Sequence, residues 1–269
     1  MALSPAVDRT RSSRYRGALY LETALELRDR KREIRERIWR LLEERGVALF
    51  PKPIYGRIPN FLGREIAAAR LARHPIFERA RVVFCNPDSP QRPVREAAIR
   101  YRKILVMATP RLREGFLIIE PGDVPRGRER EASTIRGAFR YGRKVEELPL
   151  PIDLKITGSV AVSPDGGRVG KGGGYSDLEW GILREMGAVG DGTPVATTVH
   201  DLQVVEEIPM APHDMPVDYI FTPTREIRVE PPRPKPPGIL LEELDERKIS
   251  EIPVLAKLLA KKRRVEPSS

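Results

Sequence analysis

The stretch ARVVFCNPDSPQRPVREAAIRYRKILVMATP, residues 80–110, decides the fold class of this chain. It opens with a short apolar run that ends in turn residues, ARVVFCNP (80–87), as a buried strand does. The charged segment VREAAIRYR (94–102) predicts a helix, and KILVMATP (103–110) predicts a second strand. A strand, a helix and another strand in succession favour an α/β fold with a mostly parallel sheet and helices on both faces.

The same alternation extends in both directions along the chain. Upstream, apolar residues at three- and four-residue spacings predict a helix from Leu21 to Arg45, which Gly46 ends. The further elements expected are a loop over 51–63, a helix over Arg64–Arg73, strands over 116–121, 150–163, 194–200 and 217–223, and a helix from about Ser176 to Met186.

Composition divides the chain into four segments. Residues 1–18 are rich in Arg and Ser and lack periodicity, which predicts a flexible basic arm. Residues 19–229 form a single α/β domain, in which the polar stretch 122–131 is expected to be a mobile surface excursion. The Pro-rich segment 230–238 is expected to be a semi-rigid linker. Residues 239–269 are expected to form a helical basic tail.

The totals limit the class of protein. The 269 residues are 40% hydrophobic, which is enough for a sizeable core, and no apolar run approaches a membrane span. The formal net charge of +10 favours anionic partners, although dense mixed charge is also typical of ion-pair networks in a thermophile. A lone cysteine, Cys85, excludes an internal disulfide and indicates a cytoplasmic protein.

A glycine-rich stretch, GGRVGKGGGYSDLEWGIL (166–183), lies between a predicted strand and a predicted helix. Backbone N–H groups are unpaired at a helix N-terminus, and the helix dipole favours an anion there. Glycines let the backbone approach a phosphate closely, and Arg168 and Lys171 can donate charge-assisted hydrogen bonds to it. The stretch therefore predicts an anion-binding loop, with a plain surface turn as the alternative.

The standard phosphate motifs do not fit this loop. A Walker loop needs Ser or Thr directly after Gly-Lys, but Gly172 follows Lys171. The dinucleotide fingerprint would need a glycine at Tyr175. Asp177 could cap the following helix or hold Mg²⁺, and Asp214 precedes a predicted strand at the sheet edge where ligands bind.

Three segments carry a resemblance to a known family. GGRVGKGGGYSD resembles the signature G-x-R-L-G-x-G-G-G-Y-Y-D of the 5-formyltetrahydrofolate cyclo-ligases, also called methenyltetrahydrofolate synthetases. APHDMPVDYIFTPTR (211–225) resembles their segment P-H-D-x-P-x-D-x-I-x-T-P-T-R, and KREIR (31–35) resembles their first helix. Roughly residues 22–237 are similar to one branch, the methenyltetrahydrofolate synthetase domain-containing proteins.

The resemblance implies a three-layer α/β domain of the NagB/RpiA/CoA-transferase-like type that uses ATP and Mg²⁺. It implies a nucleotide site formed by Lys31, Arg35, Gly166, Arg168, Gly170, Lys171, Gly172, Gly173, Gly174, Tyr175 and Asp177. Among these, the catalytic roles fall to Arg168, Lys171 and Tyr175, and the metal would be held by Asp177 and Asp214. The reduced folate or pterin would contact Gln91 and Tyr175. Apart from the resemblance, Arg111 and Arg113 are suited to its carboxylates, with a plain surface loop at the strand end as the equal alternative.

The implied reaction is an ATP-dependent ring closure. The N5-formyl oxygen attacks the γ-phosphorus of ATP, N10 then attacks the resulting imidoyl phosphate carbon, and loss of phosphate leaves 5,10-methenyltetrahydrofolate. Such chemistry needs positioning and charge stabilisation, which glycine backbone, Arg, Lys and Mg²⁺ supply. No side-chain nucleophile is required.

The chain departs from the family at three places, of which one is Ala161-Val162-Ser163 where the family has A-F-D before the loop. Ser176 replaces the second tyrosine of the signature, and Gln91 or Arg92 replaces the family's pterin-facing glutamate. Three functions therefore stay open: the cyclo-ligase, a same-fold ATP-dependent enzyme acting on another pterin, and a non-enzymatic nucleotide- or RNA-binding module whose basic tails contact polyanions weakly. A monomer and a small homo-oligomer are both compatible with the sequence.

Overall fold

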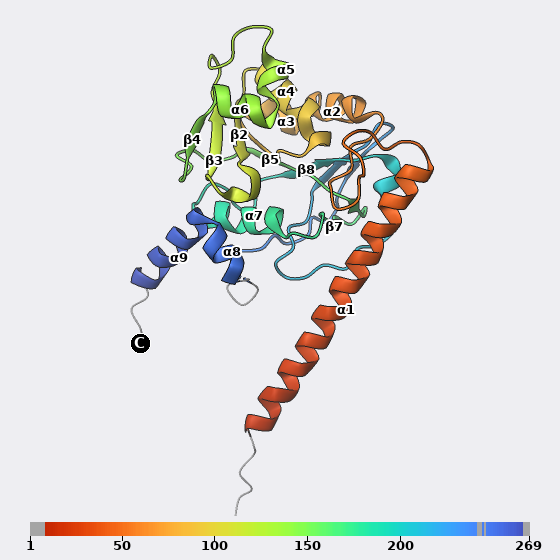
Figure 1. Cartoon of the computed structure of the whole chain (residues 1–269), viewed down its shortest axis with the longest axis vertical. Helices are drawn as coiled ribbons and strands as arrows, with labels where there is room; N and C mark the ends of the chain where they lie inside the picture. Colours follow the sequence, from red (N-terminus) through yellow and green to blue (C-terminus); the bar gives the residue numbers. More distant parts are fainter. Residues whose placement is uncertain (1–8, 241–243, 245, 266–269) are drawn as a thin grey trace, which may run out of the picture.

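An eight-stranded sheet forms the centre of the computed structural model, which describes residues 9–240, 244 and 246–265 (Figure 1). The strand order is β10-β9-β8-β5-β1-β2-β3-β4. The middle strands β9, β8, β5, β1 and β2 run parallel, and β10, β3 and β4 are antiparallel to their neighbours. The strands are β1 Val82–Cys85, β2 Ile104–Ala108, β3 Phe116–Ile119, β4 Arg143–Val145, β5 Leu154–Thr157, β8 Val195–Thr198, β9 Tyr219–Phe221 and β10 Glu226–Arg228.

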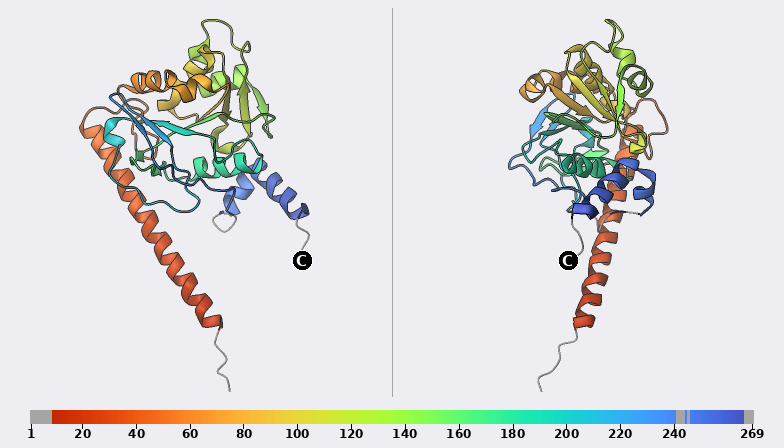
Figure 2. Two further views of the ribbon diagram at one scale, coloured as in Figure 1. Left: turned by 180° about the vertical axis from the view of Figure 1, so that it is seen from behind. Right: turned by 90° about the vertical axis from the view of Figure 1, so that its left-hand side faces the viewer.

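Helices cover both faces of this sheet (Figures 1 and 2). One layer contains α2 Arg64–Ala72, α3 Pro75–Arg79, α4 Arg92–Arg100, α5 Glu129–Ala132 and α6 Ile135–Tyr141. The opposite layer contains α7 Tyr175–Glu185, α8 Glu246–Glu251 and α9 Pro253–Val265. The predicted three-layer α/β fold with a mostly parallel sheet is confirmed.

Successive residues of the central strands pack into different layers. In β1, Val83 and Cys85 join the core under α2 and α4, whereas Val82 and Phe84 join the core under α7. Every residue of β1 is buried, because side chains alternate across a sheet that is covered on both faces. This is why the strand appears in the sequence as an unbroken apolar run.

The first helix, α1 Arg9–Glu44, leaves the body of the molecule along most of its length (Figures 1 and 2). Its C-terminal part packs Ile38, Trp39 and Leu42 into a third apolar cluster. The helix begins at Arg9, so the expectation of an arm without regular structure is wrong for residues 9–18, while residues 1–8 lie outside the described residues. A segment without apolar periodicity has no face that can pack against a core. It can still be helical when it extends a helix whose other end is packed.

The predicted strand over 150–163 is two strands in different sheets. β5 ends at Thr157, and β6 Ala161–Val162 pairs with β7 Arg168–Val169 in a separate antiparallel hairpin. The first part of the glycine-rich stretch therefore belongs to this hairpin, and only residues 170–174 form the turn into α7. The segment after β3, expected to be an excursion, continues into α5, α6 and β4.

The C-terminal segments pack against the domain. The indole of Trp180 donates to the carbonyl of Pro236 at 2.9 Å, inside the segment expected to be a linker. Ile252 and Leu255 are fully buried in the core under α7, so the described part of the tail belongs to the domain. Residues 241–243, 245 and 266–269 of that tail lie outside the described residues. None of the helices in the described ranges has the length and apolarity to cross a membrane.

Candidate active site

The chain order places a topological switch point between β1 and β5. From β1 the chain moves to β2 on one side, and later returns to β5 on the other side. In open α/β sheets, ligands bind outside the carboxyl ends of the strands at such a point. Here the Gly158 N–H donates to Asn86 Oδ1 at 3.3 Å. A Cβ on Gly158 would lie 3.0 Å from Asp88 Oδ2 and from Gln91 Oε1, so glycine lets the two strand ends meet.

The glycine turn lies directly over these strand ends. Arg168, on β7, donates to the carbonyls of Gly158 at 3.3 Å and Met215 at 3.1 Å, and pairs with Asp177 at the start of α7. Lys171 Nζ lies 3.1 Å from Asp88 Oδ1. The turn is thus attached to the ends of both β1 and β5.

Helix α1 brings two further cations to this region. Arg35 Nε donates to the carbonyl of Gly170 at 2.7 Å. Lys31, buried on the same helix face, forms an ion pair with Asp214 in the loop before β9. Helix α1 therefore contacts two distant segments: Gly170 lies 135 residues from Arg35, and Asp214 lies 183 residues from Lys31.

Glycine is required in the turn for its backbone and for its neighbours. Gly172 and Gly174 have φ of 101° and 64°, where side chains are disfavoured. A Cβ on Gly170 would lie 3.1 Å from an Arg168 nitrogen, and one on Gly172 would lie 3.7 Å from the Arg35 guanidinium carbon. The absence of side chains therefore lets cations approach the backbone of the turn.

The carboxylates predicted to hold Mg²⁺ are already engaged. Burial raises the pKa of Asp177, but the nearby Arg168, the Met215 N–H at 3.0 Å and Lys31 outweigh it and hold that pKa below its ordinary value. Asp214 is occupied by Lys31. Within the described residues no group of three or more His, Cys, Asp and Glu side chains could hold a metal ion. These two carboxylates therefore fit a protein-held Mg²⁺ poorly.

A buried polar network beneath the turn was not predicted. Lys155 of β5 pairs with Glu179 of α7, and Asn86 Nδ2 donates to the same carboxylate at 2.9 Å. Burial lowers the pKa of Lys155 and raises the pKa of Glu179, and their mutual attraction opposes both shifts. The network fixes the end of β1 against α7. Its signal in the sequence is a lysine inside the apolar run of β5.

The residues expected to contact a pterin lie on different segments of the chain. Gln91 is wholly buried beneath the strand ends, with Nε2 on the Thr198 carbonyl at 3.3 Å and Oε1 without a partner among the described residues. Tyr175 begins α7 and is partly buried. Arg111 and Arg113 are exposed, and no hydrogen bond or ion pair within the described ranges joins them to the glycine turn. Their role as substrate ligands stays a prediction.

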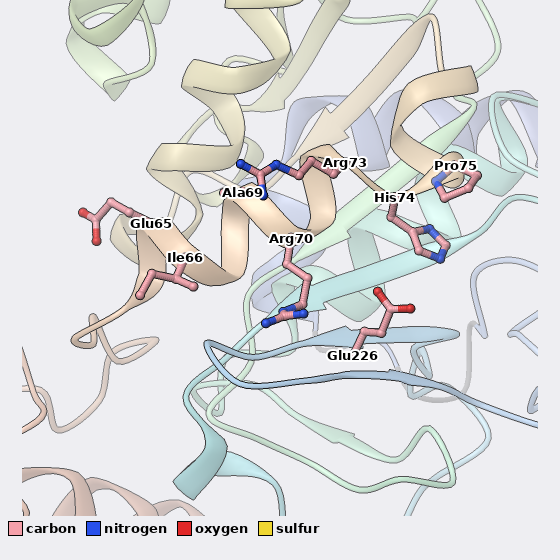
Figure 3. A pocket seen from close by; sticks show the side chains of 8 residues that line it. All are labelled: Glu65, Ile66, Ala69, Arg70, Arg73, His74, Pro75 and Glu226. Atoms are coloured by element: carbon pink, nitrogen blue, oxygen red, sulfur yellow. The ribbon is translucent and has the colours of Figure 1, made fainter.

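The groove shown in Figure 3 lies on a different surface. It has a volume of about 690 Å³ and lies between α2 and β10. Arg70, one of its lining residues, already donates to the carbonyls of Thr222 and Pro223. None of the predicted site residues lines this groove, so it is separate from the candidate site.

Comparison with known proteins identifies the family. The sequence model of the 5-formyltetrahydrofolate cyclo-ligase family matches residues 28–223. The chain belongs to this family. In this member of the cyclo-ligase family, the matched segment contains the glycine turn, the strand ends and all the cations described above. It ends before α8 and α9.

Curated relatives are found in animals. The methenyltetrahydrofolate synthase domain-containing proteins of Bos taurus, Mus musculus and Homo sapiens are 42%, 43% and 40% identical to this chain over 85%, 85% and 86% of its length. The chain spans about three fifths of those proteins, at 61%, 63% and 62%. A solved structure, the 5,10-methenyltetrahydrofolate synthetase of Aquifex aeolicus, is 19% identical with a TM-score of 0.47, covering 76% of this chain and 94% of that one.

Proposed function

We propose that this chain catalyses the ATP-dependent cyclisation of 5-formyltetrahydrofolate to 5,10-methenyltetrahydrofolate. The observation that carries the proposal is the convergence of Arg35, Arg168 and Lys171 on one glycine turn within the segment that the family matches. Cations, unpaired backbone N–H groups and a helix N-terminus together favour a polyphosphate. The position above a topological switch point supports a ligand site.

The cations of the site differ in how they would act. Arg168 is buried and fully engaged, so it would hold the turn and lend its charge without moving. Lys171 is 45% exposed and pairs only with Asp88 among the described residues, so it can exchange that carboxylate for a phosphate oxygen. The Nε of Arg35 donates to the Gly170 carbonyl, which holds the guanidinium beside the turn. Its other N–H groups could then donate to a phosphate.

The reaction would proceed in two displacements. The N5-formyl oxygen bonds to the γ-phosphorus, the bond from that phosphorus to ADP breaks, and ADP leaves. N10 bonds to the activated carbon, the carbon–oxygen bond breaks, and inorganic phosphate leaves with the N10 proton released to water. The negative charge that develops on the phosphate oxygens lies where Lys171 and Arg35 would stabilise it.

We propose that Mg²⁺ enters with the nucleotide. Mg²⁺ in such sites is usually held by substrate phosphates, waters and one or two carboxylates. Asp177 and Asp214 are ion-paired with cations, so they would contribute little to holding the metal.

The lone buried cysteine, Cys85, supports a cytoplasmic location.

A second candidate is an enzyme of the same family that acts on another reduced pterin. It is favoured by the burial of Gln91, which stands near the place of the family's pterin-facing glutamate but has no exposed atoms to offer a substrate. Asp88, whose side chain is 18% exposed and pairs with Lys171, would then be the carboxylate available to a different pterin in place of the missing glutamate.

The decisive experiment supplies purified protein with Mg-ATP and 5-formyltetrahydrofolate and follows the absorbance of the methenyl product. We expect product only when ATP is present. The variant Lys171→Ala should lower kcat/KM about tenfold or more, because one charge-assisted phosphate contact is lost. Lys144→Ala is the matched control, since Lys144 is also an exposed lysine paired with one carboxylate, Glu114, but on the edge strand β4.

The outcomes separate the candidates. Product formation that depends on ATP and on Lys171 supports the cyclo-ligase. ATP binding without product supports the second candidate. Failure of the wild-type protein to bind ATP rules out both.

A further inference from the structure

The C-terminal helix α8 reaches the glycine turn from the side opposite α1. Lys248 Nζ lies 5.8 Å from the centre of the Tyr175 ring. A Cβ placed on Gly174 would lie 2.9 Å from the same Nζ, so the ammonium lies against the backbone of the residue that begins α7. The segment that contains Lys248 lies outside the family match, which ends at residue 223.

The position of Lys248 is fixed by buried neighbours. Directly after α8, Ile252 is fully buried, and Leu255 of α9 is fully buried beside it. The Ile252 N–H donates to the Lys248 carbonyl at 3.1 Å, which continues the helical path from the lysine to this anchor. Figures 1 and 2 show α8 and α9 on the same side of the sheet as α7, with α9 directed away from it. The lysine is therefore held at the turn by packing of its own segment.

Among the described residues, no carboxylate forms an ion pair with Lys248, although the chain uses such pairs for Lys31, Lys155 and Lys171. A cation beside a helix N-terminus is unfavourable, because both carry positive charge. An ammonium placed there, beside a turn that Arg35 also contacts, is stabilised when an anion binds at the turn.

Three glycines of the turn each face one cation. The Cβ positions of Gly170, Gly172 and Gly174 point toward Arg168, Arg35 and Lys248, at 3.1, 3.7 and 2.9 Å from the nearest atom of each. The three cations come from β7, α1 and α8, so the turn is enclosed from separate parts of the chain. Lys248 approaches the backbone of the turn as closely as the other two cations do.

We propose that Lys248 is a phosphate-binding residue of this site, supplied by the C-terminal segment that the family match does not include. The inference rests on the proposed function, since it takes the ligand to be ATP. Lys248 contacts the phosphate chain across the start of α7, and the Tyr175 ring beneath its side chain keeps the ammonium directed at Gly174.

The test measures the Kd of ATP and of inorganic tripolyphosphate by titration calorimetry. Tripolyphosphate carries the phosphates without the nucleoside. The variants are Lys248→Met, Lys248→Arg and the control Lys257→Met, which removes the same charge from a lysine of α9 paired with Glu146. We expect Lys248→Met to raise both Kd values about tenfold or more. Lys248→Arg should stay within a few-fold of the wild type, and Lys257→Met should have no effect beyond twofold.

Each other outcome overturns the inference in a distinguishable way. Unchanged Kd values in Lys248→Met, with ATP bound normally by the wild type, mean that the lysine only covers Tyr175, and the proposed function stands. A loss for ATP alone means that Lys248 contacts the nucleoside. Absence of ATP binding in the wild type rejects the proposed function together with the inference. Thermal melting of every variant confirms that affinities are compared between folded proteins. Where Lys248→Met is unstable, Lys248→Gln replaces it, with the same expected rise in both Kd values.

Discussion

Asp177 shows how one side chain of the site serves the fold. It is the carboxylate partner of Arg168, a guanidinium that is 3% exposed, and it also accepts the Met215 N–H at 3.0 Å. A buried charge that loses its partner is strongly destabilising. The helix-capping residue expected from the sequence is therefore a link between β7, α7 and the loop before β9, and its side chain has little freedom to bind a metal.

This link predicts a pH-dependent loss of stability in Asp177→Asn. Breaking the pair should lower the free energy of unfolding by about 3 kcal/mol at pH 7. The folded-state pKa of Asp177 lies below its ordinary value of 3.8, because Arg168 and its other partners outweigh burial. The carboxylate thus stabilises the protein above that value, and its contribution is lost as pH falls through the lower folded-state pKa. The difference between variant and wild type should shrink below pH 4, as urea unfolding at several pH values would measure.

Asp191→Asn is the control for this measurement. Asp191 pairs with Arg184 but its side chain is 85% exposed, so the change should cost at most about 1 kcal/mol. A difference between Asp177→Asn and wild type that stays constant down to pH 3 would contradict the ion-pair explanation.

At the scale of helices and strands, the sequence pattern predicted the features that depend on residues within a single helix or strand. The start of α7 was expected at about Ser176 and lies at Tyr175. The family resemblance alone predicted that cations of α1 belong to the site, and Arg35 contacts the carbonyl of Gly170. Contacts between distant segments are not predicted by local pattern: Glu179 is 93 residues from Asn86, and the lysine within β5 indicates a buried partner without identifying it. The helices α5 and α6, of 4 and 7 residues, are too short to show a periodic apolar face.

The two ends of α7 offer a paired test of the glycine turn. Gly174 before the helix and Gly187 after it have φ of 64° and 69°, so alanine should cost each about 1 kcal/mol in backbone strain. Nothing lies within 4 Å of a Cβ on Gly187, whereas one on Gly174 would displace Lys248. We expect similar losses of stability from Gly174→Ala and Gly187→Ala in chemical denaturation, but weaker ATP binding only in Gly174→Ala. Equal ATP affinities in the two variants would mean that the turn does not depend on this approach.

At the scale of the whole molecule, the boundaries expected from composition differ from the packing. The Pro-rich segment was expected to be a linker because proline disfavours regular structure, yet Lys235 pairs with Asp218 at 2.9 Å and the Pro236 carbonyl accepts from Trp180. Composition describes what a segment cannot form, but not what it packs against. The sequence predicted that the tail is helical. It did not predict that the tail packs against α7, because that contact exists only in the folded chain.

This packing predicts that the C-terminal segment unfolds together with the sheet. Leu255 of α9 is fully buried in the core that also contains Phe84 of β1 and Trp180 of α7. Leu255→Ala should therefore lower the free energy of unfolding by about 2–5 kcal/mol and keep a single transition, because it opens a cavity in a shared core. Leu25→Ala makes the same chemical change where the side chain is 59% exposed on α1, and should alter stability by no more than about 0.5 kcal/mol. If circular dichroism and tryptophan fluorescence gave an unchanged midpoint for Leu255→Ala, the tail would be an independent appendage and could not hold Lys248 at the turn.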